Sequence, residues 1–328
     1  MQSHLVDNLC EPLERYLRQA GIYYRIFARQ KSIGSIMNKL SQKREDYIRK
    51  GKKMQDYVGI RIVFYFQDDV EIFHEKLKMF EGYDSANESN TNTDLDGVAA
   101  LREQIEQNEA LKPLSNMFPL YDKVFMPQRL NIVLKMPFVV ANAFHAELPP
   151  DLSNQDKQLI DETYEVQLRT VLSEGWHEVE HDLRYKKRNE QWWEYCQEES
   201  RQLNGIYATL ESSECALSNL IAGLAYKNFK SKEWDAMIRN HFRLRFNESK
   251  LSEDFVDYLN NNLDIAKECF KIERGDLIKW IWEIKSTFQL TTDMAFCIAN
   301  RKKWNIPSII SMEPRPIKLI LDRDFPVA

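Results

Sequence analysis

Three short segments with the composition of β-strands constrain the fold of this chain more than any other feature. They are GIRIVFYF at residues 59–66, RLNIVLKM at 129–136 and YEVQLRT at 164–170. Helical patterns precede them, and the chain beyond about residue 190 is mostly helical in pattern. We therefore predict an α+β fold, in which a mixed β-sheet of about five strands flanked by helices is followed by a helical C-terminal region at residues 191–328.

Periodicity and composition predict the elements around these strands. Residues 5–20 and 29–50 have helical spacing, whereas SANESNTNTDLD at 85–96 has no aromatic or basic residue and indicates a mobile loop at about 83–97. An acidic helix is expected at about 98–112, and further helices near 253–262, 276–288 and 292–303. IKLILD, at 317–322, is expected to form a short strand.

The cysteines and the N-terminus bear on the cellular compartment. The five cysteines are isolated from one another, without a C-x-x-C pair, which fits a reducing environment. The N-terminus lacks the apolar core of a signal peptide, and no apolar run approaches the length of about 18 residues that a membrane span needs. The sequence thus predicts a soluble, cytoplasmic protein without a membrane partner.

Positive charge is concentrated at residues 20–53, where ten lysines and arginines and only two acidic residues give a local net charge of +8. Part of it forms a stripe at helical spacing, made of Lys31, Ser35, Lys39 and Lys43. Such a stripe is either a solvated helix face or a cradle for phosphates. Together with the guanidinium of Arg29, it offers the groups that a polyphosphate needs.

A carboxylate stands just before the first predicted strand. Asp56 precedes this strand, and Arg61 lies two residues inside it. Mg²⁺ is usually held by one or two carboxylates together with substrate phosphates, so Asp56 is a candidate metal ligand. The alternative is a loop aspartate paired with a neighbouring lysine.

The segment 164–170 alternates apolar and polar residues. Its period of two places Glu165, Gln167 and Arg169 on one face of a strand. A polar strand face is more often exposed to solvent than part of an active site. The order of the motifs favours the active site, because a basic helix, an aspartate before a strand, a glutamate on a later strand and a polar helix follow one another.

In this order the motifs resemble those of the RelA/SpoT synthetase family, whose pattern runs Arg-x-Lys-x-x-x-Ser, Asp-x-x-Gly-x-Arg, Glu-x-Gln-x-Arg-Thr, and then a Trp before Glu-His-x-x-x-Tyr-Lys. The matching residues are Arg29, Lys31, Ser35, Asp56, Gly59, Arg61, Glu165, Gln167, Arg169, Thr170, Trp176, Glu180, His181, Tyr185 and Lys186. The resemblance covers roughly residues 20–190. It implies a nucleotidyltransferase-like synthetase domain at residues 1–190.

The resemblance also implies a role for each residue. The phosphates of ATP would be bound by Arg29, Lys31, Ser35, Lys39 and Arg61. Asp56 and Glu165 would be the catalytic residues and would bind Mg²⁺, and Glu165 is also a candidate base. The acceptor would be bound by Gln167, Arg169, His181, Arg129 and Tyr121.

The implied reaction is the transfer of pyrophosphate from ATP. An acceptor hydroxyl attacks the β-phosphorus in line and AMP leaves, which requires positioning and charge neutralisation more than covalent help. The expected acceptor is the 3′-hydroxyl of GDP or GTP. The alternative within the family is the 3′ end of tRNA, as in the toxic small synthetases.

The acceptor loop departs from the family, in which it usually reads Gly-Tyr-x-Ser-x-His. Gln128 stands at the place of the base-stacking tyrosine, and Ile132 at that of the histidine. Either the acceptor is not the usual guanine nucleotide, or another aromatic residue, such as Tyr121 or Phe125, takes the place of the base-stacking tyrosine. Glu174 also stands where the family usually has Asp or Asn.

Two other functions are alternatives. HEVEH at 177–181 is a literal H-E-x-x-H, which on a helix would place His177 and His181 for zinc with Glu178 as the base. The second alternative is a catalytically inactive module that senses nucleotides. A sensor, however, does not need two carboxylates that bind a metal. For residues 191–328 we expect homo-oligomerisation or a regulatory role.

Overall fold

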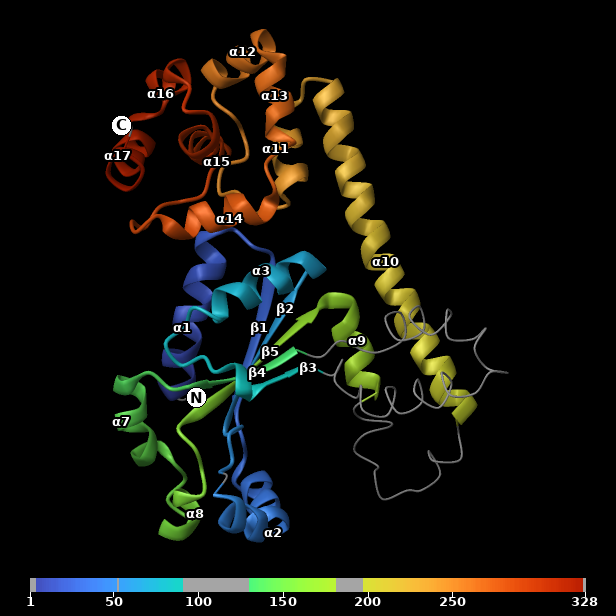
Figure 1. Cartoon of the computed structure of the whole chain (residues 1–328), viewed down its shortest axis with the longest axis vertical. Helices are drawn as coiled ribbons and strands as arrows, with labels where there is room; N and C mark the ends of the chain where they lie inside the picture. Colours follow the sequence, from blue (N-terminus) through green and yellow to red (C-terminus); the bar gives the residue numbers. More distant parts are fainter. Residues whose placement is uncertain (1–3, 52, 91–129, 181–196, 327–328) are drawn as a thin grey trace, which may run out of the picture. The chain divides into compact units, whose positions relative to one another are not determined.

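The computed structural model describes residues 4–51, 53–90, 130–180 and 197–326. The chain forms two compact units, one made of Met1–Glu11 and Tyr24–Glu214 and the other of Pro12–Tyr23 and Cys215–Ala328. Figure 1 traces the elements of both along the chain. The predicted domain boundary between residues 190 and 191 lies outside the described residues.

The first unit is built on a five-stranded sheet with the strand order β1-β2-β5-β4-β3. β2 and β5 are parallel, whereas the other neighbouring pairs are antiparallel. The strands are β1 (Tyr24–Gln30), β2 (Val58–Phe64), β3 (Glu88–Asn90), β4 (Leu130–Lys135) and β5 (Thr163–Thr170). The predicted α+β fold with a mixed sheet is therefore confirmed.

Helices connect and flank these strands. They are α1 (His4–Gln19), α2 (Ile33–Lys50), α3 (Gln67–Leu77), α7 (Phe138–Glu147), α8 (Asn154–Gln158), α9 (Val171–Glu180) and α10 (Gln197–Lys230). α9 follows β5 without a loop, so the end of that strand fixes where the helix begins.

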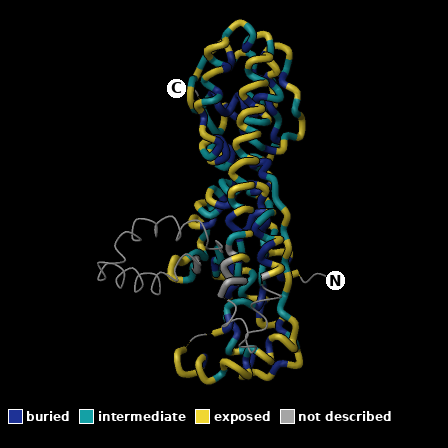
Figure 2. Tube along the Cα trace, turned by 90° about the vertical axis from the view of Figure 1, so that its right-hand side faces the viewer, coloured by how far each residue is buried: buried dark blue, intermediate teal, exposed yellow. Residues whose placement is uncertain are grey.

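One face of the sheet is apolar and the other is polar. Ile60, Val166 and Ile132 are neighbours in the register and are fully buried on the apolar face. The ring centroid of Phe73 in α3 lies 5.6 Å from that of Phe64 in β2, which helps to cover this face. Figure 2 shows the buried residues of both units in dark blue. The alternation predicted for residues 164–170 is confirmed, because Glu165 and Gln167 lie on the polar face, less buried than their neighbours.

The helix predicted for residues 29–50 is wrong at its start. Arg29 belongs to strand β1, and α2 begins only at Ile33. Ser32 caps this helix, because its side chain accepts a hydrogen bond from the backbone N–H of Ser35. The sequence does not predict this strand, because charged and polar side chains interrupt the apolar run that marks a strand.

The segment predicted as a mobile loop at about 83–97 contains regular structure at its start. Ser85–Asn87 form a 3₁₀ turn, and Glu88–Asn90 form β3, which pairs with β4 at the sheet edge. Pairing with a neighbouring strand outweighs local composition here. Residues 91–97 and the helix predicted at about 98–112 lie outside the described residues.

The second unit is helical in its described residues, as predicted. Its further helices are α11 (Trp234–Phe242), α12 (Glu253–Asn261), α13 (Leu263–Cys269), α14 (Arg274–Glu283), α15 (Thr292–Ala299), the π-helix η5 (Asn300–Trp304), α16 (Pro307–Met312) and α17 (Arg315–Asp324). All residues of α15 except Asp293 are buried. Along the described residues, no helix combines the length and the apolar character needed to cross a membrane.

The strand predicted at residues 317–322 is wrong, because this segment lies within α17. A proline occupies the first turn of the helix, a position where the fixed φ of proline favours helix initiation. A short apolar run does not by itself distinguish a strand from a buried helix segment.

The end of α1 and the turn after it belong to the second unit. The side-chain amide of Gln19 donates to the carbonyl oxygens of Ile281 and Ile284 at 3.2 and 2.9 Å. Gly21 has a φ of +65°, and a Cβ there would lie 2.6 Å from the carbonyl oxygen of Arg245. The turn thus requires glycine, both for its left-handed backbone and for the close approach of the chain.

Candidate active site

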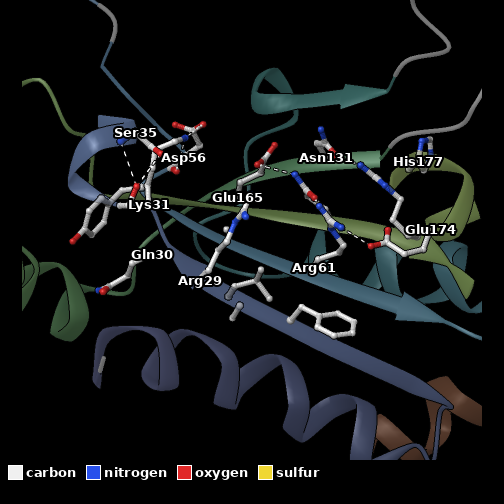
Figure 3. Close-up of a pocket in the computed structure, with 18 of the residues that line it drawn as sticks. Arg29, Gln30, Lys31, Ser35, Asp56, Arg61, Asn131, Glu165, Glu174 and His177 are labelled. Atoms are coloured by element: carbon white, nitrogen blue, oxygen red, sulfur yellow. Dashed lines mark hydrogen bonds and ion pairs between the residues drawn. The ribbon is translucent and has the colours of Figure 1, made fainter. Parts of the chain in front are cut away.

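Strand register brings the predicted site residues together on the polar face of the sheet. Arg29 lies opposite Gly59, and Gly59 lies opposite Glu165, so these residues form one row across β1, β2 and β5. The next row consists of Phe27, Arg61, Gln167 and Asn131. Alternate residues of a strand point to the same side, so both rows face one space. Figure 3 shows Arg29 and Glu165 between a group around Asp56 and a group around Arg61.

This space is a cleft of about 1090 Å³. It is lined by eight of the predicted site residues: Arg29, Lys31, Ser35, Asp56, Arg61, Glu165, Gln167 and Arg169. A ninth, Lys39, reaches the same site through its ion pair with Asp56. Gly59 lies in the floor, and nothing stands within 4 Å of the place of a Cβ. Its missing side chain leaves room between Arg29 and Glu165.

Three predicted acceptor-binding residues, Tyr121, Arg129 and His181, lie outside the described residues, as do Phe125 and Gln128. The cleft is also lined by residues that the sequence motifs did not single out, among them Phe27, Gln30 and Asn131. Phe27 could be recognised as a cleft residue only if β1 were predicted as a strand. Once residues 24–30 are taken as a strand, its period of two places Phe27 on the same face as Arg29.

The end of the cleft at the start of α2 is suited to phosphate. The first turn of this helix contains no acidic residue, and the free N–H groups of a helix N-terminus attract anions. Lys31 and Lys39 both donate to the same oxygen, Oδ2 of Asp56, at 2.5 and 2.7 Å. Two ammonium groups, one just before α2 and one in that helix, therefore converge on one carboxylate.

Asp56 is ionised but only half satisfied. Burial raises the pKa of its carboxyl, yet the hydrogen bonds and charges of Lys31 and Lys39 outweigh burial and hold the pKa below its ordinary value. Its second oxygen, Oδ1, is buried without a hydrogen-bond partner among the described residues. The lysine pairing considered from the sequence is thus present, and one carboxylate oxygen is still available to a cation.

Arg61 organises the other end of the cleft. Its Nη1 contacts the carboxylates of Glu174 and Glu178 in α9, the second at 2.5 Å. Its Nε donates to Gln167 Oε1 at 3.1 Å, and Gln167 Nε2 donates to Glu165 Oε2 at 3.0 Å. Two carboxylates already balance the charge of Arg61, so its clearest role here is to orient Gln167 and, through it, Glu165.

The same two carboxylates determine the ionisation of Arg61. Burial lowers the pKa of the guanidinium, but its hydrogen bonds to Glu174 and Glu178 outweigh burial and raise the pKa. Arg61 is therefore a permanent cation. Its predicted contact with an ATP phosphate stays a prediction, for which the phosphate would have to compete with two carboxylates.

Arg29, unlike Arg61, is not paired with a carboxylate among the described residues. It is exposed, lines the cleft, and has no hydrogen-bonded or ion-paired side chain as a partner within the described part of the chain. A guanidinium presents a planar fork of donors that matches carboxylate and phosphate oxygens. The cleft thus contains a cation that can bind an anionic ligand without first losing a protein partner.

Arg169 lies at the rim and is buried. Its Nη2 donates to Asn131 Oδ1 at 2.7 Å, and its Nη1 donates to the carbonyl oxygen of Leu168 at 2.8 Å. These bonds connect β5 to β4 and orient Asn131 at the edge of the cleft. The predicted contact of Arg169 with an acceptor stays a prediction.

The zinc alternative depends on His177 and His181. His177 lines the cleft, but its ring packs against Trp176 and Tyr207, with centroid distances of 5.4 and 6.1 Å. Glu178 contacts Arg61 rather than a histidine, and His181 lies outside the described residues. Within the part that the structure describes, no three histidine, cysteine or acidic side chains are grouped as a metal would require.

The carboxyl group of Glu211 in α10 predicts how the stability of the fold depends on pH. Burial raises the pKa of Glu211 to about 7, against a hydrogen bond with Tyr207 that lowers it, and the carboxylate of Glu214 adds to the increase. The folded chain thus keeps a proton on Glu211 up to about pH 7, whereas the unfolded chain releases it near pH 4.5, the ordinary pKa of this group. This contribution to stability is complete below that pH and is lost as the pH rises through about 7.

We therefore expect Glu211→Gln, which stays neutral, to raise the midpoint of thermal unfolding at pH 8 and to have little effect near pH 4.5. Glu45→Gln, an exposed position in α2, controls for the loss of one negative charge. An equal gain for both variants at all pH values would contradict the assignment of this titration to Glu211.

Similar solved structures include three bacterial proteins. Small alarmone synthetase 1 from Bacillus subtilis is 16% identical, with a TM-score of 0.40, and the match covers 66% of this chain and 89% of that one. A GTP pyrophosphokinase family protein from Streptococcus pneumoniae is 17% identical, with a TM-score of 0.39 over 66% and 85%. Small alarmone synthetase 2 from Bacillus subtilis is 19% identical, with a TM-score of 0.37 over 65% and 92%. No curated protein matches the chain.

A family model gives the more specific result. Residues 28–118 match the model described as the region found in RelA and SpoT proteins. The matched part contains the cleft residues from Ala28 to Arg61, whereas Phe27 of β1 lies just before it. Over these residues the chain is therefore similar to RelA and SpoT proteins, as the resemblance of its motifs implied.

Proposed function

We propose that this chain transfers pyrophosphate from ATP to an acceptor hydroxyl. The observation that carries the proposal is the composition of one cleft. An arginine without a partner among the described residues, two lysines that hold one oxygen of Asp56, and Glu165 come together there. Phosphoryl transfer depends mainly on positioning and on neutralising charge, and this cleft offers both.

The phosphates of ATP would bind at the start of α2. Lys31, Lys39 and the helix N-terminus supply positive charge there, and Arg29 adds a fork that can hold two oxygens. The polyphosphate would compete with Asp56 for the two lysines, because its several negative charges attract an ammonium group more strongly than one carboxylate does. ATP binding would therefore release Asp56 from its present partners.

The released carboxylate fits a hard divalent cation. Mg²⁺ prefers oxygen ligands and is usually held by one or two carboxylates together with substrate phosphates. Asp56 qualifies because Oδ1 has no hydrogen-bond partner among the described residues, and Glu165 is the second proposed ligand. When bound, the cation would neutralise phosphate charge and help to align the phosphate chain.

The proposed step forms a bond between the acceptor oxygen and the β-phosphorus. The bond from that phosphorus to the oxygen that bridges to the α-phosphate breaks, and AMP leaves with the electron pair. Glu165 is the candidate base as well as a candidate ligand. Where it does not bind the cation, it would accept the proton of the acceptor hydroxyl, because Gln167 holds only one of its oxygens. Arg29 and the two lysines would stabilise the charge on the transferred group.

The proposed acceptor is the 3′-hydroxyl of GDP or GTP. A tRNA 3′ end is the second candidate, and one surface observation favours it. Lys43 and Lys53 are exposed and have no acidic partner within the described residues. Contacts of such lysines with a nucleic-acid backbone would make the reaction strongly dependent on salt, which transfer to a free nucleotide would not be.

Incubation with ATP and Mg²⁺, and with GDP, GTP or bulk tRNA in parallel, tests the proposal. The expected result is the formation of AMP together with a pyrophosphorylated acceptor in one of the three reactions. Formation of ADP and free phosphate, or no consumption of ATP in any of them, would contradict it.

We also expect Arg29→Ala to raise the KM for ATP about tenfold or more, because a charge-assisted bidentate contact is lost. Lys43→Ala is the matched control, since this side chain lies on α2 but does not line the cleft. The measurement is the ATP dependence of transfer at a fixed concentration of GDP. Equal KM values for Arg29→Ala and the wild type would remove Arg29 from the donor site.

A further inference from the structure

Strand geometry alone does not direct Asp56 into the cleft. In β2, Val58 and Ile60 are fully buried, whereas Gly59 between them lines the cleft. Side chains alternate between the two faces of a strand, so the same alternation continued back from Val58 would turn Asp56 away from the cleft. Asp56 instead lines the cleft and contacts Lys31 (Figure 3). The segment before β2 must therefore depart from strand geometry.

Residues 55–57 form this break in the strand. Met54 still pairs with the segment that leads into β5, because its N–H donates to the carbonyl oxygen of Leu159 at 2.8 Å and its carbonyl oxygen accepts from the N–H of Asp161 at 2.9 Å. The ladder between β2 and β5 begins only at Val58, and residues 55–57 belong to neither strand. The chain is thus held on both sides of a three-residue break.

One buried side chain bonds to the break itself. The hydroxyl of Thr163, the first residue of β5, donates to the carbonyl oxygen of Gln55 at 3.0 Å. Thr163 is 4% exposed and is not among the residues that line the cleft. Its hydroxyl therefore holds the backbone next to Asp56 without itself reaching a ligand in the cleft.

We propose that Thr163 is a positioning residue for Asp56: its hydroxyl fixes the break at Gln55 and so keeps the Asp56 carboxylate turned into the cleft. This inference rests on the proposed function, in which Asp56 binds a divalent cation. Hydrogen bonds behind a metal ligand orient it, and their loss typically weakens metal binding about 10- to 100-fold.

The bond from Thr163 matters most when ATP is bound. In the free protein, Lys31 and Lys39 both hold Oδ2 of Asp56, and Lys31 Nζ also lies 3.4 Å from the backbone carbonyl oxygen of Asp56. The proposed function has both lysines turn to the phosphates of ATP, so these contacts no longer orient the carboxylate. The bond between Thr163 and Gln55 involves no proposed ligand-binding group, and it would stay in place to fix the segment.

A simpler role for Thr163 is that of a branched residue suited to the start of a strand. Valine separates the two roles, because it keeps the branched shape and the preference for strands but has no hydroxyl. Serine makes the opposite change, since it keeps the hydroxyl and loses the methyl group.

The test measures binding of Mn²⁺ in the presence of a non-hydrolysable ATP analogue, with the electron paramagnetic resonance signal of free Mn²⁺ as the readout. Mn²⁺ takes the same kinds of oxygen ligands as Mg²⁺. We expect Thr163→Val to weaken Mn²⁺ binding about tenfold or more. Thr163→Ser should bind Mn²⁺ as tightly as the wild type, and neither variant should change the affinity for the analogue without metal.

The matched control is Thr209→Val. The hydroxyl of Thr209 also donates to a backbone carbonyl oxygen at 3.0 Å, that of Gly205, but it is exposed and lies in α10 of the same unit. This variant should leave Mn²⁺ binding unchanged.

Unchanged Mn²⁺ binding in Thr163→Val would overturn the proposal. An equal loss in Thr163→Ser would also overturn it, because the effect would then belong to the methyl group and its packing. Thr163→Ala replaces Thr163→Val if the valine variant does not fold. If neither variant folds, the hydroxyl supports the fold as a whole, and the positioning role is wrong.

The proposed function fails separately from this inference, and Asp56→Ala distinguishes the two. If Asp56→Ala abolishes Mn²⁺ binding but Thr163→Val leaves it unchanged, only the positioning role is wrong. If Asp56→Ala leaves Mn²⁺ binding unchanged, the proposed metal site is wrong, and the inference fails with it. If Mn²⁺ binding depends on both residues but the wild-type chain transfers pyrophosphate to no acceptor, the positioning role stands and transfer is wrong.

Discussion

Asp56→Ala and Glu165→Gln should each reduce pyrophosphate transfer about 1000-fold or more while leaving the thermal unfolding of the chain nearly unchanged. Loss of a metal ligand or base removes several kcal/mol of transition-state stabilisation, and about 1.4 kcal/mol corresponds to a factor of ten. Neither side chain belongs to the apolar core, because both line the open cleft. The measurement is the rate of AMP formation at saturating ATP and Mg²⁺.

The two variants should differ in how they bind ATP. Asp56→Ala leaves Lys31 and Lys39 without their carboxylate partner, so ATP without Mg²⁺ should bind at least as tightly as to the wild type. Glu165→Gln should not change that affinity, since no lysine contacts Glu165 in the described structure. If metal-free ATP bound more weakly to Asp56→Ala than to the wild type, the proposal that phosphate displaces Asp56 from the two lysines would be contradicted.

Glu162→Gln is the control for both carboxylates. Glu162 immediately precedes β5 and is exposed, and it contacts His145 rather than the cleft. We expect this variant to keep the wild-type rate of transfer. If Glu162→Gln reduced the rate of transfer as much as Glu165→Gln does, the net charge near this strand would matter rather than the position of Glu165.

Arg301→Ala should lower the free energy of unfolding of the second unit by about 3–5 kcal/mol, the range for breaking one half of a buried ion pair. The side chains of Arg301 and Glu313 are 1% and 0% exposed. Arg301 donates through Nε and Nη2 to the two oxygens of Glu313, at 2.8 and 2.5 Å. Without the arginine, a buried carboxylate loses its partner, and denaturant titration measures the loss.

Two further variants separate this buried pair from surface charge. Arg323→Ala removes an exposed arginine paired with Asp324 in the same unit, and it should leave the unfolding midpoint nearly unchanged. The double variant Arg301→Met, Glu313→Leu should recover much of the lost stability, because no unpaired buried charge is left. Equal effects of Arg301→Ala and Arg323→Ala would contradict the proposed role of the buried pair.

The sequence predicted those parts of the site whose geometry is local. Glu165 and Gln167 were placed on one face because residues two apart in a strand point the same way, and the structure has them there. Asp56 was placed at the start of β2 for a similarly local reason. The strands β2, β4 and β5 could be recognised because their apolar residues are consecutive or alternate clearly.

The rest depends on contacts between segments far apart in the sequence, which local patterns do not contain. Arg61 meets Glu174 and Glu178 across more than 100 residues, so its phosphate role was predicted without knowledge of its two acidic partners. The helical spacing from residue 29 hides the end of β1, and no strand is predicted for residues 24–28, so the sequence alone does not assign Phe27 to a face of the sheet. The aromatic residues that the sequence offers in place of the family's tyrosine, Tyr121 and Phe125, lie outside the described residues.

The most direct test of the central claim follows the label of ATP during turnover. ATP labelled at the γ-phosphorus and ATP labelled at the α-phosphorus are incubated separately with the wild-type chain, Mg²⁺ and the acceptor that supports turnover. The γ-label should appear in the acceptor and the α-label in AMP, in equal amounts, and both products should be lost in Glu165→Gln. Appearance of the γ-label in free phosphate or pyrophosphate, with an unlabelled acceptor, would contradict pyrophosphate transfer by this cleft.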